Sequence, residues 1–305
     1  MLKNKASPMA KILENRDLYI FCLPAIIITL IFHYVPIYGV QIAFRDYSVR
    51  RGIWNSEWVG WEHFIRFFNS PNAMQIIWNT LVLSIYSLVA GFPIPIILAL
   101  LINSFRYKKY GKVIQLVTYA PNFISVVVMS GMILLFLSPQ VGMVNKIIGL
   151  AGLEPINFMG LRTTWRHIYV WSGVWQSMGW SSVVYFAALS GVSPEFHEAA
   201  IVDGASKLQR ILYIDLPSIM PVAVMLLILS FGSMLSIGFE KAYALQNDLN
   251  LNVSEIISTY VYKVGIIHND MAYSTAIGLF NSAVNAVLLI TVNSLSRKLS
   301  DNALW

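Results

Sequence analysis

Residues 67–105 read FFNSPNAMQIIWNTLVLSIYSLVAGFPIPIILALLINSF, a run of 39 residues without a single Asp, Glu, Lys or Arg. A helix needs about 20 mostly apolar residues to cross ~30 Å of hydrocarbon, because each residue adds about 1.5 Å to its length. This run is therefore long enough to span a membrane even with some tilt. The alternative, a helix buried in a large soluble protein, is disfavoured because such helices seldom run this long without a charge.

Five further charge-free windows, each 24 to 33 residues long, lie around this run: residues 18–44, 113–145, 167–194, 216–239 and 271–296. The six windows hold 177 of the 305 residues, so all 36 charges fall at the other 128 positions. The chain is 57% hydrophobic and 12% charged, with a mean hydropathy of +0.63, which is unlike an ordinary soluble domain. We therefore predict an all-α, polytopic membrane protein with six transmembrane helices.

The distribution of Lys and Arg predicts the orientation in the membrane. With the N-terminus inside, cytoplasmic segments carry twelve of the 21 basic residues, four of them directly beside two windows: Arg106, Lys108, Lys109 and Lys112. We expect a cytoplasmic segment at 1–17, a six-helix domain at 18–296 and a cytoplasmic tail at 297–305. The net charge of +6 follows from this topology, and no basic helix or aromatic-basic interleaving indicates a nucleic-acid partner.

Motifs for catalysis and nucleotide binding are absent from the sequence. It holds no G-x-x-x-x-G-K-[ST] loop, no H-E-x-x-H and no G-x-S-x-G. Cys22 is the one cysteine, which excludes an intrachain disulfide and indicates no metal site. We predict a protein without enzymatic activity, metal or cofactor of its own. The first window is too long for a signal peptide and lacks a small-x-small cleavage site, so we interpret it as an uncleaved anchor.

One polar segment, residues 193–217, separates the fourth and fifth windows and obeys local rules for a short helix. Ser193 can cap a helix, and Pro194 suits its first position. Glu195 and Glu198 lie in the opening turns, where the positive end of the helix dipole stabilises negative charge. Gly204 offers the left-handed conformation that ends the helix.

A second short helix is expected directly after this turn. Ser206 can cap it, it would run to about Asp215, and Pro217 would begin the next membrane span. The result is a helix, a turn and a helix that lie across the inner membrane surface. Ala199 and Ala200 add little bulk, so a groove on a partner could receive this element closely. The alternative is an amphipathic interfacial hairpin without a partner.

The spacing of this segment resembles the EAA motif, by which permease subunits of ATP-driven importers engage their ATPases. The residues that carry the resemblance are Glu198, Ala199, Ala200, Asp203, Gly204, Ala205, Ile214, Leu216, Pro217 and Pro221. One residue departs from the pattern: Ile211 stands where many members have phenylalanine. Similarity to the LplB-type branch of sugar importer permeases extends along the chain, at residues 24–47, 155–158, 238–241 and 257–261 and at the ending from Ser296 to Trp305.

The resemblance implies a type I importer of the maltose-transporter kind in a bacterial cytoplasmic membrane. In that family, two similar permease subunits form a pore surrounded by lipid, and an extracellular solute-binding protein delivers the sugar. Two ATPase subunits bind ATP and Mg beneath the pore and dock on the EAA segment. The LplB-type branch handles oligosaccharides, often those released from plant or algal polysaccharides, and translocates them by alternating access.

A sugar path combines aromatic planes with uncharged amides and hydroxyls, because pyranose rings offer apolar C–H faces and a rim of hydroxyls. The fourth window provides aromatic residues at helical spacing, and two asparagines one turn apart in the sixth window are costly in lipid unless they face the interior. Our candidates for substrate contact are Trp171, Trp175, Gln176, Trp180, Tyr185, Glu240, Asn281 and Asn285. The alternative for each is helix packing.

The rival function is a secondary transporter driven by an ion gradient. Such proteins usually keep ionisable residues within the bilayer to bind a proton or sodium ion. None of the six windows contains an acidic residue, which favours the ATP-driven importer. A membrane scaffold, the third interpretation, leaves the polar segment at 193–217 without a purpose.

Overall fold

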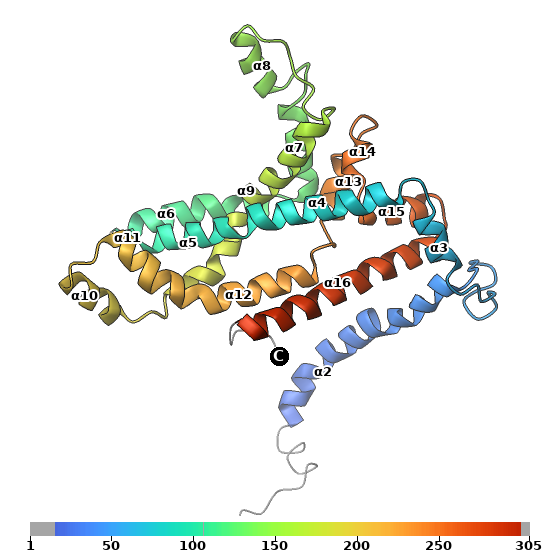
Figure 1. The fold of residues 1–305 in the computed structure, drawn as a ribbon, viewed down its shortest axis with the longest axis horizontal. Coiled ribbons are helices and arrows are strands. Elements are labelled where there is room, and N and C mark those ends of the chain that lie inside the picture. The colour runs from blue at the N-terminus through green and yellow to red at the C-terminus, as the bar shows by residue number, and fades with distance from the viewer. Residues whose placement is uncertain (1–15, 106, 300–305) are drawn as a thin grey trace, which may run out of the picture.

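The computed structural model describes residues 16–105 and 107–299 (Figure 1). Throughout this part of the chain the regular elements are helical, and strand-like pairing is limited to one bridge between Arg45 and Trp58. The predicted all-α class is confirmed. Residues 1–15, Arg106 and residues 300–305 lie outside the described residues, and with them most of the predicted cytoplasmic segment at 1–17 and tail at 297–305.

All six charge-free windows fold into helices. The first forms α2 (Arg16–Thr29), a π-helical turn η1 (Leu30–Tyr34) and a 3-10 helix η2 (Val35–Phe44). The second and third form α4 (Ala73–Gly91), α5 (Pro93–Asn103), α6 (Lys108–Tyr119), η3 (Ala120–Phe123) and α7 (Val126–Phe136). The last three form α9 (Arg162–Leu189), α12 (Leu216–Gly232) and α16 (Met271–Leu299).

Four continuous helical stretches of the described residues are both long and apolar enough to cross a membrane: Arg16–Phe44, Ala73–Asn103, Lys207–Gly232 and Met271–Lys298. The third window adds a broken span, because its two halves meet at 95°. The fourth window forms α9, which is 28 residues long but more polar than the other spans. Its position agrees with this polarity, since α9 packs against four other helices, α4, α5, α6 and α12.

The break in the third window follows from its sequence. Pro121 cannot donate a backbone hydrogen bond, and Ser125 caps the start of α7 by accepting from the Val128 amide. The Gln176 side-chain amide of α9 donates to the Ile124 carbonyl at 2.7 Å, which satisfies the interrupted backbone. Nearby, α6 approaches the backbone of Gly179 very closely. A Cβ at this residue would lie 2.1 Å from the Thr118 carbonyl oxygen, so the contact requires glycine. The bend is therefore held by α9.

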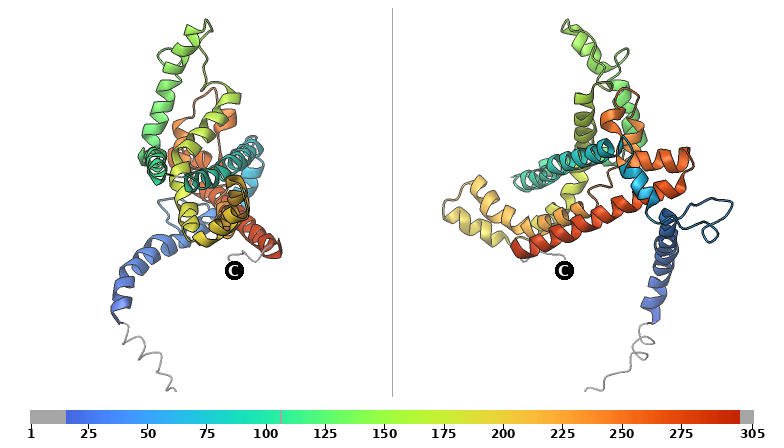
Figure 2. Two further views of the ribbon diagram at one scale, coloured as in Figure 1. Left: turned by 90° about the vertical axis from the view of Figure 1, so that its left-hand side faces the viewer. Right: turned by 45° about the vertical axis from the view of Figure 1, so that its right-hand side comes forward.

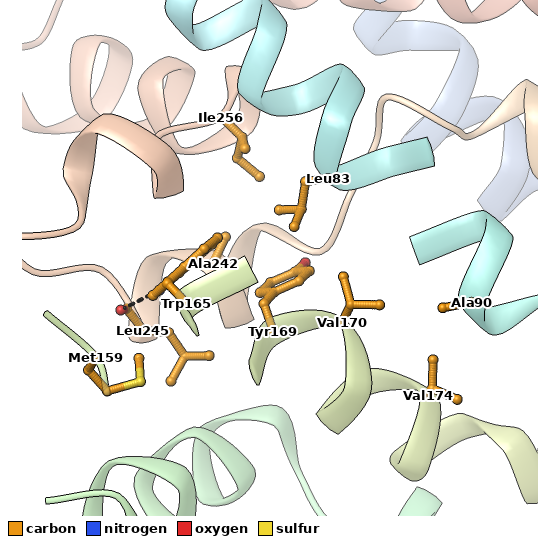
Figure 3. Packing of buried hydrophobic residues seen from close by; sticks show 10 residues of the cluster. All are labelled: Leu83, Ala90, Met159, Trp165, Tyr169, Val170, Val174, Ala242, Leu245 and Ile256. Carbon is orange, nitrogen blue, oxygen red and sulfur yellow. Dashed lines mark hydrogen bonds between the residues drawn. The ribbon is translucent and has the colours of Figure 1, made fainter. Parts of the chain in front are cut away.

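The central core lies along α9. Its buried residues Trp165, Tyr169, Val170 and Val174 pack against α4 and the segment from residue 242 to 256 (Figure 3). The Trp165 indole is fully buried and donates to the Leu245 carbonyl at 3.0 Å. Core formation thus joins the fourth window to the loop that follows the fifth.

Shorter helical elements complete the fold. They are α3 (Glu62–Phe68), α8 (Met143–Leu150), α10 (Pro194–Val202), α11 (Lys207–Arg210), η4 (Ile211–Asp215), α13 (Phe239–Ala244), α14 (Leu251–Ser254), α15 (Ile257–Tyr262) and η5 (Lys263–Ile267). In Figure 1, α10 and α11 lie at one end of the long axis, whereas α3 and α15 lie at the other. Helix α2 leaves the bundle from the α3 end and buries none of its residues against the described chain (Figure 2).

Replacing Trp165 with alanine is expected to lower the free energy of unfolding by about 3–5 kcal/mol, because it removes a fully buried indole. It also leaves the Leu245 carbonyl without its donor. Denaturant unfolding of the purified protein in detergent measures the effect. Trp78→Ala, which truncates an exposed indole on α4, is the matched control and is expected to change stability by less than about 0.5 kcal/mol. Equal losses in both variants would contradict the assignment of Trp165 to the core.

Candidate functional site

The polar segment at 193–217 begins with the helix that the sequence predicts. Helix α10 has Pro194 in its first turn, and the Ser193 hydroxyl caps it by accepting from the Glu195 amide at 3.4 Å. Its last residue is Val202, and Gly204, directly after the C-cap Asp203, has a φ of +77°, the left-handed conformation that follows a helix end. Both the start and the end of this helix confirm the prediction.

The second half of the segment differs from the prediction. Ser206 and Gln209 form a capping box as expected of a helix start, but no new span begins at Pro217. Instead α11, η4 and α12 form one continuous stretch, Lys207–Gly232. The Leu216 amide bonds to the Ile211 carbonyl five residues back, and this π turn accommodates the missing donor of Pro217. The polar segment is therefore joined to the fifth span by continuous helix.

Helix α10 is exposed over most of its surface. None of its residues is buried, and Phe196, Ile201 and Val202 are large apolar side chains exposed at the end of the molecule. The EAA-type residues of the segment are exposed or half-buried: Glu198, Ala199, Asp203, Gly204 and Pro217 are exposed, and Ala200, Ala205, Ile214 and Leu216 are half-buried. The surface of the segment therefore combines exposed apolar side chains with exposed acidic residues and the small side chains of its alanines.

A buried carboxylate, which the sequence-based reasoning missed, holds α10 in place. Asp215 Oδ1 lies 3.3 Å from His197 Nε2 and 3.4 Å from Asn103 Nδ2, and its side chain is almost fully buried. It lines a cavity of about 780 Å³ between α10 and the end of α5. The detectable signal was an acidic residue placed directly against a charge-free window, where burial requires a partner.

A second cavity, of about 360 Å³, lies in the middle of the bundle between α4, α9, the end of α12 and α13. Its polar lining consists mainly of hydroxyls, from Ser84, Ser87, Ser177, Ser230 and Ser233. Gln176 also lines it, and Lys241 is the only charged side chain of its described lining. This volume is within the range of about 300–1,000 Å³ typical of small-molecule sites.

Of the eight residues predicted to contact substrate, only Gln176 lines this central cavity. Trp171, Trp175 and Trp180 are 50%, 44% and 54% exposed on other faces of α9. Tyr185 is buried in an apolar cluster with α5 residues, and Glu240 is exposed at the start of α13. A role of these five in transport stays a prediction.

The two asparagines of α16 face the protein interior, as predicted from their cost in lipid. Asn285 is buried, and its side-chain oxygen accepts from the Leu235 amide at 2.9 Å. Asn281 donates to the Leu235 carbonyl at 3.5 Å. Both amides satisfy the irregular backbone after α12, so their contacts in the structure are packing contacts. Substrate contact by either residue also stays a prediction.

Residues 77–301 match the family described as the binding-protein-dependent transport system inner membrane component. The chain belongs to this family. Among its relatives in Bacillus subtilis (strain 168), the polygalacturonan/rhamnogalacturonan transport system permease protein YteP is 40% identical over 97% of this chain and 92% of the relative. Protein LplB of the same organism is 39% identical over 97% and 93%.

Solved structures agree with the family assignment. A bacterial ABC transporter involved in the import of the acidic polysaccharide alginate contains a chain that is 38% identical, with a TM-score of 0.88. The match covers 95% of this chain and 98% of that one. The alginate transporter in complex with its alginate pentasaccharide-bound periplasmic protein matches at 37% identity and the same TM-score.

Membership in this family confirms the ABC importer permease fold and makes the chain a non-catalytic membrane subunit. ATP hydrolysis in such systems is carried out by partner ATPases, which agrees with the lack of a nucleotide-binding loop in the sequence. The family also contradicts the rival function, transport driven by an ion gradient.

Replacing His197 with alanine is expected to loosen α10, because Asp215 then loses its closest partner inside a poorly solvated site. Hydrogen–deuterium exchange is expected to show amide exchange in α10 about 10-fold faster or more. Phe196→Ala, at the neighbouring exposed position, is the control and is expected to leave exchange unchanged. The same exchange rates in the two variants would show that the His197–Asp215 pair does not hold the helix.

Proposed function

We propose that this chain is one of two pore-forming permease subunits of an ATP-driven importer of oligosaccharides derived from plant or algal polysaccharides. The observation that carries the proposal is the full-length similarity to two carriers of such sugars, the YteP permease at 40% identity and the alginate importer at a TM-score of 0.88. In this proposal the chain lies in a bacterial cytoplasmic membrane with both termini inside. An extracellular solute-binding protein delivers the sugar.

The central cavity supports passage of a sugar. The Ser84, Ser177 and Ser230 hydroxyls each donate to a carbonyl one turn back in their own helix. Their oxygens keep free lone pairs, which can accept hydrogen bonds from sugar hydroxyls. Weak acceptors spread over three helices suit a cargo that must bind and then leave.

The geometry also supports a second permease subunit. Ser177 and Ser233 line the cavity yet are exposed, so this chain leaves one side of it open. Helix α2 is uncovered along its length, which leaves it free to contact lipid or the second subunit. A homologous partner facing the open side would complete the path.

Coupling to ATP is assigned to the segment at 193–217. Two separate ATPase subunits, which bind ATP and Mg, would dock on the exposed apolar surface of α10 and on the turn at Gly204. Because α11 continues into α12 without a hinge, a displacement of the docked segment moves the fifth span with it. That movement would open the path alternately to the two sides of the membrane.

Replacing Gly204 with tryptophan is expected to leave the permease inserted but to uncouple ATP hydrolysis from uptake. A Cβ at this position meets nothing within 4 Å in the described chain, so the added bulk would act on a docked partner, in addition to the backbone strain that any side chain meets at a φ of +77°. Gly204→Asn is the control, since asparagine tolerates the left-handed conformation and adds little bulk. Sugar uptake per ATP hydrolysed, measured in proteoliposomes, reports the effect. Normal coupling in the tryptophan variant would remove the docking claim.

Filling the central cavity tests the transport path independently. Ser177→Phe is expected to lower oligosaccharide uptake about 10-fold or more, because the ring occupies the cavity on α9. Ser282→Phe on α16 is the matched control, since both serines are exposed and both donate to a glycine carbonyl one turn back. Uptake by the complete importer in proteoliposomes measures both. Equal uptake in the two variants would place the path elsewhere.

A further inference from the structure

We propose that Lys241 makes the central cavity selective for sugars that carry a carboxylate, so that the cargo is an acidic, uronate-containing oligosaccharide. This inference rests on the proposed function, because it takes the central cavity as part of the sugar path. It goes further by naming the chemical class of the cargo and the residue that recognises it.

Lys241 is a buried cation whose charge is not neutralised by any described residue. Its side chain is 7% exposed, and Nζ donates to the Tyr169 carbonyl at 2.7 Å. Nζ also lies 4.9 Å from the centre of the Tyr169 ring. No ion pair joins it to an acidic residue within the described part of the chain. Lys263, by contrast, forms an ion pair with Glu255 at 2.7 Å.

The ammonium group of Lys241 is held against α9. The Tyr169 hydroxyl donates to the Gly238 carbonyl at 3.2 Å, which ties the start of α13 to α9. Gly173 provides the space for Nζ, because a Cβ at that residue would lie 3.1 Å from it. An ammonium group held by one carbonyl still has two N–H donors available. These two donors belong to Lys241, which lines the cavity.

The surrounding groups provide no negative charge. The other polar side chains of the described lining are serine hydroxyls, one glutamine amide and the Tyr169 phenol. The Ser87 oxygen is buried without a hydrogen-bond partner among the described residues. An uncompensated charge in such a site is costly, and a carboxylate in the cavity would offset that cost where a neutral sugar could not.

A carboxylate bound beside the Lys241 ammonium would favour its charged form. Tyr169 is the only other titratable group of the described lining.

The test compares trigalacturonate with its methyl ester, which has the same sugar chain without charge. The complete importer, with its ATPases and binding protein, is reconstituted in proteoliposomes at pH 7. Lys241→Met is expected to lower trigalacturonate uptake about 10-fold or more, because the variant keeps the apolar stem but loses the cation. Uptake of the ester and ATP hydrolysis stimulated by the loaded binding protein are expected to persist. Lys241→Arg is expected to retain preference for the acid.

Lys263→Met is the matched control, because Lys263 has a protein partner and does not line the central cavity. A loss of binding-protein-stimulated ATP hydrolysis in Lys241→Met, or an equal loss of acid and ester uptake, would overturn the proposal and leave Lys241 as a structural tie. Unchanged uptake of both sugars would overturn it as well. If the unsubstituted importer carried neither sugar nor any neutral oligosaccharide, the proposed function itself would fail.

Discussion

The constraint on which this structure depends is that hydrocarbon offers no hydrogen-bond partner to a peptide group. A spanning segment must therefore satisfy its own backbone, and helices do so. At two places where the described chain departs from regular helices inside its apolar windows, side chains of neighbouring helices supply the missing partner. Gln176 binds the Ile124 carbonyl at the bend before α7, and Asn285 binds the Leu235 amide after α12.

The second of these places adjoins the central cavity. The break after α12 leads through Gly238 into α13 and so brings Lys241 to the cavity. Irregular backbone at membrane depth is tolerated where it is covered by protein or lines a cavity, and this break does both. The asparagines of α16 belong to the same arrangement. The free-energy cost of placing these amides in a membrane is offset because they hydrogen-bond to the Leu235 backbone, in the irregular segment beside the cavity.

Much of this arrangement could be predicted from local rules. Charge-free windows predicted the helices because length and composition alone decide whether a segment is stable in lipid. Ser193 and Gly204 predicted the bounds of α10 because capping and a positive φ depend on neighbouring residues only. The π turn before Pro217 was not predicted, since a proline in the first turn of a new helix and a proline after a π turn have the same local sequence.

The central cavity could not be predicted for a different reason. Its walls come from four elements that are up to about 150 residues apart in sequence, so no spacing rule connects Ser87 with Ser177 or Lys241. The aromatic residues of α9 are at helical spacing, but periodicity shows only that residues share a face. It does not show what that face meets. In the structure the cavity adjoins the face with Gly173 and Ser177, whereas Trp171 and Trp175 are exposed elsewhere.

The segment at 193–217 and the central cavity are connected by a single element. The stretch Lys207–Gly232 is 26 residues long, or about 39 Å at 1.5 Å per residue. It starts at the turn after α10 and carries Ser230 of the cavity in its last turn. Had Pro217 separated two helices, as the sequence first indicated, motion at the polar segment could be absorbed at that hinge. Because the π turn keeps the helix continuous, the turn after α10 and the cavity wall at Ser230 belong to one helical stretch without a break.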